Sequence, residues 1–125
     1  MSLPLAFVIE DDELIAKIFS AAVEEAQYET VIIRNGIEAL EVLSSRIPDL
    51  VVLDLHLPGI SGINILREIR NDNRLKNTRV LIVSADATQT EYLRVQSDQI
   101  LVKPVGFYMM REVAARFRPQ EQLPE

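Results

Sequence analysis

Four short apolar runs in this chain each end at a polar or charged residue, and this pattern restricts the possible folds more than any other feature. The runs cover residues 5–9, 50–53, 80–83 and 100–102. The polar residues that follow them are, in chain order, Glu10-Asp11-Asp12, Asp54, Ser84 and Lys103. Continuous apolar runs of this length are typical of strands buried on both faces of a parallel sheet. Because parallel strands end at one edge of their sheet, we expect these polar groups to meet there, where open α/β sheets bind ligands.

Helical patterns separate the runs, so strands and helices alternate along the chain. After the first run, two adjacent rows of apolar residues predict a helix capped by Asp12. The rows are Leu14, Ile18 and Ala22, and Ile15, Phe19 and Val23. Residues 30–33 predict a further strand, and Ser61 is expected to cap a helix after Asp54. Residues 87–96 are only weakly patterned, and the alternation as a whole predicts a parallel sheet with both faces covered.

Composition excludes several classes of function. The formal net charge of −6 disfavours nucleic acid as a direct partner, because phosphate binding requires a basic face. The chain has no cysteine and His56 is its single histidine, which excludes thiolate and histidine-rich zinc sites. No glycine-rich phosphate loop is present. No apolar run could span a bilayer and no signal-peptide pattern is present, so we expect a cytoplasmic protein without a membrane partner.

Five segments of the chain share their residues and their spacing with one known family. They are Val8-Ile9-Glu10-Asp11-Asp12, Asn35-Gly36-Ile37-Glu38-Ala39-Leu40, Asp54-Leu55-His56-Leu57-Pro58-Gly59, Ser84-Ala85 and Lys103-Pro104. On these segments the chain resembles the receiver domain of bacterial two-component response regulators. The resemblance implies a flavodoxin-like α/β fold, a doubly wound five-stranded parallel sheet with strand order 2-1-3-4-5. It also implies a single receiver domain over residues 1–118, followed by a frayed tail at residues 119–125.

The resemblance implies a signalling phosphoacceptor that catalyses only its own phosphorylation and dephosphorylation. Asp54 would accept a phosphoryl group from a histidine kinase or a phosphotransfer protein. Ser84 would contact that group through its hydroxyl and Lys103 through its ammonium, and Pro104 would follow a cis peptide bond, as in relatives. The modified chain would then change its binding to a downstream protein that the sequence does not identify.

The same resemblance implies a magnesium site built from hard oxygen ligands. Glu10 and Asp11 would form its acidic pair with Asp54, and Asp11 is preferred as the direct ligand. The main-chain carbonyl of His56 would supply a further ligand. Independently of the family, clustered carboxylates repel one another unless a cation or a proton enters the cluster, and Mg²⁺ binds through carboxylates and phosphate.

Three departures from the family pattern concern the side of the domain that transmits the signal. The segment between Ser84 and Lys103 is a few residues shorter than usual, and the Gly-Ala that relatives carry before the last strand is absent, where this chain reads Ser97-Asp98-Gln99. Ile100 replaces the aromatic residue that usually takes part in switching. These departures leave open an alternative, a phosphorylation-independent receiver that serves as a protein-interaction module. A hydrolase with an aspartate nucleophile is disfavoured, because His56 occupies the position where such an enzyme requires a second aspartate.

Overall fold

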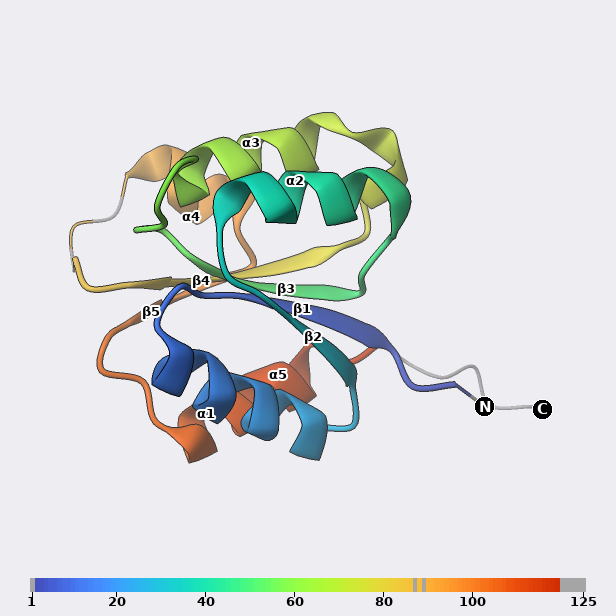
Figure 1. Cartoon of the computed structure of the whole chain (residues 1–125), viewed down its shortest axis with the longest axis vertical. Helices are drawn as coiled ribbons and strands as arrows, with labels where there is room; N and C mark the ends of the chain where they lie inside the picture. The colour runs from blue at the N-terminus through green and yellow to red at the C-terminus, as the bar shows by residue number, and fades with distance from the viewer. Residues whose placement is uncertain (1, 87, 89, 120–125) are drawn as a thin grey trace.

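The sheet of this protein has the predicted flavodoxin-like topology. The computed structural model describes residues 2–86, 88 and 90–119. Within them, five parallel strands lie in the order β2-β1-β3-β4-β5 (Figure 1). The strands are β1 (Leu5–Ile9), β2 (Glu29–Ile33), β3 (Leu50–Asp54), β4 (Arg79–Ser84) and β5 (Gln99–Val102). Each of the four apolar runs therefore lies in a strand, and these four strands, β1, β3, β4 and β5, carry their polar residues at or just beyond their carboxyl ends.

Helices cover both faces of the sheet. They are α1 (Glu13–Glu25), α2 (Gly36–Ser45), α3 (Gly62–Asn71), the short 3₁₀ helix η1 (Asn73–Leu75), α4 (Glu91–Gln96) and α5 (Phe107–Arg116). Helices α2, α3 and α4 lie on one face, and α1 and α5 lie on the other (Figure 1). Asp12 caps α1 and Ser61 caps α3, as the sequence predicted. Among the described residues, no helix combines the length and the hydropathy that a bilayer crossing requires.

The apolar runs are continuous because the central strands are buried from both sides. On β1, Ala6 and Val8 belong to the core on the α1/α5 face, while Phe7 and Ile9 belong to the core on the α2/α3 face. Every residue of β3 is buried, including Asp54 at its end. Strands with alternate side chains in two different cores read as uninterrupted apolar segments, which is why the period-two pattern of a half-exposed strand is absent.

The two apolar rows predicted for α1 do not both face the sheet. Phe19 and Val23 are buried, but Leu14 is 67% exposed and Ile18 is 37% exposed. The core on this face contains Phe19 and Val23 of the second row and, from the first row, only the small residue Ala22. A helix packed on a sheet buries a limited arc, and the two adjacent rows together are wider than that arc.

In its described residues, the weakly patterned segment before β5 contains one short helix. Thr90 caps α4, and this helix ends at Gln96 after six residues. Ala87, where the sequence placed the start of the segment, lies outside the described residues, as do residues 120–125 of the expected tail. The boundary of the receiver domain at residue 118 stays a prediction.

Tyr28 joins the start of β2 to the end of α5. Its side chain is 1% exposed, and its hydroxyl donates a hydrogen bond of 2.8 Å to the carbonyl oxygen of Ala114. Burial raises the pKa of the Tyr28 phenol above its ordinary value; the positive charge of Arg118 opposes this shift, and the charge of Asp49 adds to it. The folded state therefore favours the neutral phenol.

This contact predicts an alkaline limit to stability. Because the folded pKa of Tyr28 exceeds the unfolded value of about 10, its contribution is intact below about pH 10 and declines above it, by at most about 1.4 kcal/mol per pH unit. Tyr28→Phe should lower the free energy of unfolding by about 1 kcal/mol at neutral pH through the lost hydrogen bond. It should also flatten the alkaline decline in urea unfolding, whereas Tyr108→Phe, at a 72% exposed tyrosine, should do neither. Equal alkaline slopes for wild type and Tyr28→Phe would contradict the assignment.

Candidate functional site

Three carboxylates meet at the carboxyl edge of the sheet. Asp54 ends β3, and Glu10 and Asp11 follow β1 directly, so two neighbouring strands deliver them to the same place. One oxygen from each of the three side chains lies within 4.8 Å of the others. Glu10 and Asp54 are almost completely buried, whereas Asp11 is exposed. The convergence expected from the strand ends is therefore present, with one acid open to solvent.

Lys103 lies between two of these acids. Its ammonium is 3.3 Å from an oxygen of Asp54 and 3.3 Å from an oxygen of Glu10. The lysine follows β5, and its amide donates a 2.7 Å hydrogen bond to the carbonyl oxygen of Ser84. The Lys103–Pro104 peptide bond is cis, as in relatives, which the sequence alone left open. The ammonium thus reaches the acids across the ends of three strands.

Ser84 and His56 occupy the rim of the cluster in different ways. Ser84 is buried at the end of β4, and its hydroxyl oxygen accepts a 3.1 Å hydrogen bond from the amide of Asp86. His56 has an exposed side chain, but its amide donates a 3.0 Å hydrogen bond to Asp54. One oxygen of Asp54 is therefore held by the His56 amide and the other faces Lys103. These contacts fix the orientation of the Asp54 carboxylate.

The cluster carries more negative than positive charge. Burial raises the pKa of Glu10 to about 7; the amide of Asp12 opposes the shift, and the nearby Asp54 adds to it. For Lys103, burial alone would lower the pKa, but the attraction of Asp54 and Glu10 outweighs burial, and the net pKa is raised. Because burial is the largest cause, the raised pKa reflects the removal of Glu10 from water, and a cation in the cluster would favour its charged form. Such an all-oxygen cluster fits a hard divalent cation such as Mg²⁺, which would replace the proton on Glu10.

Gly62 positions the strand end that carries Asp54, and the sequence pattern did not single it out. Its amide donates a 3.1 Å hydrogen bond to the carbonyl oxygen of Leu55. A Cβ atom built on Gly62 would lie 2.6 Å from the carbonyl oxygen of Asp54 and 2.6 Å from the Cα of Leu55. Only a residue without a side chain allows α3 to approach the backbone this closely. The one sequence signal was its place directly after the cap Ser61.

Gly62→Ala should therefore disturb both stability and the site. Because the clash involves backbone atoms that cannot rotate away, we expect a loss of about 2–3 kcal/mol in the free energy of unfolding. Amide chemical shifts of Asp54 and Leu55 should also move. Gly106→Ala is the matched control, because a Cβ on Gly106 would meet nothing within 4 Å, and it should change stability by less than about 1 kcal/mol. Similar losses for both variants in urea unfolding would refute the close approach.

Comparisons with known proteins agree on one family. The model described as "Response regulator receiver domain" matches residues 6–115. The polar-differentiation response regulator DivK of Brucella anthropi is 33% identical over 102 residues, which covers 79% of this chain and 83% of that protein.

Two solved structures show the same arrangement of elements. The receiver domain of the Francisella response regulator 1452 has a TM-score of 0.79 at 30% identity, and it covers 91% of this chain and 95% of its own. The receiver domain of the sensor histidine kinase PA1611 from Pseudomonas aeruginosa has a TM-score of 0.81 at 20% identity. The match covers 93% of this chain and 98% of that one. That protein is described with a magnesium ion coordinated in its active-site cleft, while its likeness to this chain concerns the fold alone.

Proposed function

This chain belongs to the response regulator receiver domains, and from that family membership we propose that it is a phosphorylation-switched signalling module with Asp54 as its phosphoacceptor. Receiver domains are not classical enzymes; they take phosphoryl groups from histidine kinases or phosphotransfer proteins. The observation that carries the proposal is the meeting of Asp54 with Glu10, Asp11 and Lys103 at one sheet edge. We propose a cytoplasmic location, because the chain would have to meet the cytoplasmic module of a histidine kinase.

The proposed reaction is an in-line transfer to a carboxylate oxygen of Asp54. A bond forms between that oxygen and phosphorus, while the bond from phosphorus to the donor breaks and the donor leaves with the electron pair. Such a transfer needs little covalent assistance from the protein; it needs positioning and neutralisation of the phosphoryl oxygens. The His56 amide holds Asp54 in place, and the Lys103 ammonium, 3.3 Å from Asp54, lies where it could compensate the added charge.

Mg²⁺ is the proposed cofactor of this transfer. Glu10, Asp11 and Asp54 would hold it, with the carbonyl oxygen of His56 as a further ligand. When bound, the ion neutralises phosphoryl oxygens and removes the repulsion among the carboxylates. The magnesium described in the PA1611 receiver domain supports this assignment for a chain of the same fold.

Ser84 is proposed to transmit the event to the loop after β4. In the unmodified chain its hydroxyl oxygen accepts a hydrogen bond from the amide of Asp86. A phosphoryl group on Asp54 would offer a charged acceptor to the proton of this hydroxyl, which the bond from Asp86 does not use, and the resulting charge-assisted hydrogen bond would draw Ser84 toward Asp54. The loop would then move toward Asp54. Ile100 is half-buried in the core on the α2/α3 face and has no hydroxyl, so we expect this response without an aromatic switch.

The proposal is tested by metal-dependent labelling. Incubation with Mg²⁺ and acetyl phosphate should add one phosphoryl group, as measured by intact-protein mass spectrometry. EDTA should abolish the addition, and excess Mg²⁺ should restore it. If no donor adds a phosphoryl group at any Mg²⁺ concentration, the chain is instead a phosphorylation-independent interaction module.

A further inference from the structure

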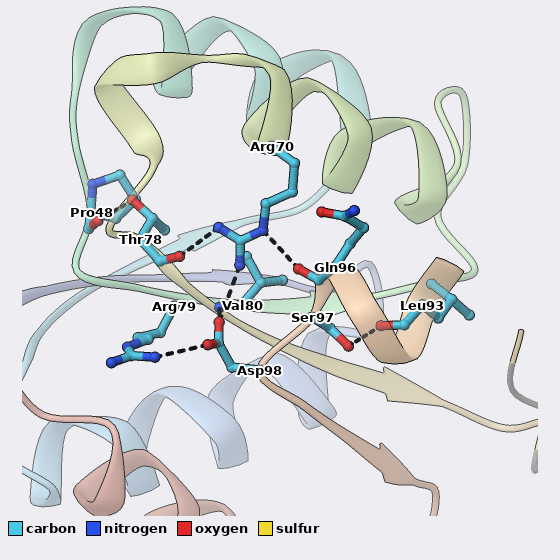
Figure 2. Close-up of polar contacts among 9 residues, drawn as sticks. All are labelled: Pro48, Arg70, Thr78, Arg79, Val80, Leu93, Gln96, Ser97 and Asp98. Carbon is cyan, nitrogen blue, oxygen red and sulfur yellow. Dashed lines mark hydrogen bonds and ion pairs between the residues drawn. The ribbon is translucent and has the colours of Figure 1, made fainter. Parts of the chain in front are cut away.

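A groove of about 830 Å³ opens at the amino edge of the sheet, the edge opposite to Asp54. Its walls come from the turn before β4, the carboxyl end of α4 and the carboxyl end of α5. Figure 2 shows the polar side chains that form one of these walls. Nothing in the proposed phosphotransfer uses this part of the molecule.

The lining of the groove is basic although the chain as a whole is acidic. The net charge of the chain is −6, yet five cationic side chains and two carboxylates line the groove, an excess of three positive charges. The cations are Arg70, Lys76, Arg79, Arg116 and Arg118, and the carboxylates are Asp49 and Asp98. Like charges gathered in a concave surface raise the local concentration of ligands of the opposite sign.

Both carboxylates already have partners within the fold. Asp98 accepts hydrogen bonds from the amide of Val80 at 2.7 Å, from Arg70 at 3.1 Å and from Arg79 at 3.0 Å (Figure 2). The Asp49 carboxylate accepts a hydrogen bond of 2.8 Å from the amide of Leu5. The Asp98 carboxylate is therefore largely engaged within the fold, and one oxygen of Asp49 is engaged as well.

The Arg70 guanidinium makes the wall rigid. It donates to the carbonyl oxygen of Gln96 at 2.7 Å and to that of Thr78 at 2.9 Å, in addition to its bond with Asp98. These three contacts join α3, the start of β4 and the end of α4 (Figure 2). A wall held in this way keeps its shape before any ligand arrives, which reduces the ordering that binding requires.

Three cations of the groove have no acidic partner among the described residues. Lys76 and Arg116 are exposed at its rim. The Nε atom of Arg118 is shielded from solvent, and within the described part of the chain it has no hydrogen-bond partner. A shielded guanidinium N–H without an acceptor is unfavourable, so an anion in the groove that accepts a hydrogen bond from Arg118 would be stabilised.

We propose that this groove binds a small anion with two or more phosphate groups and an apolar part, the chemical class of nucleoside diphosphates. A guanidinium group can donate two parallel hydrogen bonds to the oxygens of one phosphate. An excess of three positive charges also favours a polyvalent anion over a single carboxylate. Phe117 and the 68% exposed Val95 supply apolar surface for the remainder of the ligand. The volume lies within the range of small-molecule sites. Arginine side chains would hold the phosphates here, since the chain has no glycine-rich phosphate loop.

The test is an NMR titration of the isotope-labelled chain with pyrophosphate and, separately, with ADP, in the absence of divalent cations. Saturable shifts should appear at the amides of residues 77–79, 96–98 and 116–118, while the amides of Asp54 and Ser84 stay in place. ADP should bind at least threefold more tightly than pyrophosphate because of its apolar part. Absence of saturation, equal affinity for both ligands, equal shifts with sulfate at the same ionic strength, or shifts centred on Asp54 would overturn the proposal.

Two double variants distinguish binding in the groove from a general effect of net charge. Lys76→Gln combined with Arg116→Gln alters two exposed side chains and should preserve folding, yet weaken ADP binding at least tenfold. Lys17→Gln combined with Arg67→Gln makes the same change in net charge on exposed residues of α1 and α3 and should alter the affinity less than twofold. Equal weakening by both pairs would show that only the net charge matters and would overturn the site.

Discussion

Asp54→Asn should abolish phosphoryl incorporation while leaving the free energy of unfolding unchanged or higher. An amide is a far weaker nucleophile than a carboxylate, so labelling by acetyl phosphate should fall at least a hundredfold, equivalent to about 2.7 kcal/mol in activation free energy. Glu41→Gln is the matched control, because it removes one negative charge from an exposed position on α2 and should leave labelling within twofold. Labelling of Asp54→Asn at the rate of the wild type would remove Asp54 from the proposed role.

The stability of this variant follows from the charge balance of the cluster. Two carboxylates about 4 Å apart repel by about 4 kcal/mol at an effective dielectric constant of 20. Asp54→Asn loses the attraction to Lys103 but removes this repulsion from Glu10 and Asp11. The Lys103 ammonium keeps its contact with a carboxyl oxygen of Glu10, 3.3 Å away. We therefore expect no net destabilisation from the loss of a buried ion pair.

The pH dependence of stability gives a second measurement on the same variant. Without Mg²⁺, the pKa of Glu10 is raised from 4.5 to about 7, chiefly by burial and in part by Asp54. A carboxyl with a raised folded pKa supports the fold below the unfolded pKa, and this support is lost as the pH rises toward the folded pKa. Wild type in EDTA should therefore lose stability between about pH 5 and pH 8, and Asp54→Asn should lose less. Equal losses in urea unfolding would show that Asp54 does not act on Glu10.

Asp98→Ala should destabilise the protein by about 2–4 kcal/mol. The Asp98 carboxylate is only 18% exposed, and its loss would leave the Val80 amide without its acceptor and the Arg70 guanidinium without its negatively charged partner (Figure 2). Removing one partner of a buried charged network is costly because the remaining groups stay desolvated. The network also fixes the end of the short helix α4, so amides near Gln96 should exchange faster with solvent.

Controls separate this network from an ordinary surface ion pair. Arg79→Gln removes one contact of Asp98 from a 57% exposed side chain, so it should cost less than about 1 kcal/mol. Asp98→Asn keeps an oxygen acceptor for the Val80 amide, so its loss in the free energy of unfolding should lie between those of Asp98→Ala and Arg79→Gln. Phosphorylation should persist in all three variants, because Asp98 precedes β5 while Asp54 ends β3, at opposite edges of the sheet. A loss below about 0.5 kcal/mol for Asp98→Ala in urea unfolding would contradict the network.

Local sequence patterns were sufficient to predict a parallel α/β sheet and the meeting of charged residues at its carboxyl edge, whereas the strand order followed from the family resemblance. The apolar runs marked buried parallel strands, and the polar residue at each end marked the edge where Asp54, Glu10, Asp11 and Lys103 meet. Both kinds of information are short-range, because a strand and the residue after it are neighbours in the chain. The roles proposed for these residues in phosphotransfer, and that of Ser84, remain predictions.

Only the tertiary structure decided which residues support that site and which residues form the groove. The exposure of Leu14 and Ile18, the approach of Gly62 to the backbone of Asp54, and the contacts of Asp98 all depend on segments distant in the chain. At the sequence level Asp98 was only a departure from the family pattern, with no partner to explain it. One amphipathic pattern is compatible with several apolar arcs, and a charged residue has many possible partners. The choice among them is made by packing against other elements, which no local pattern contains.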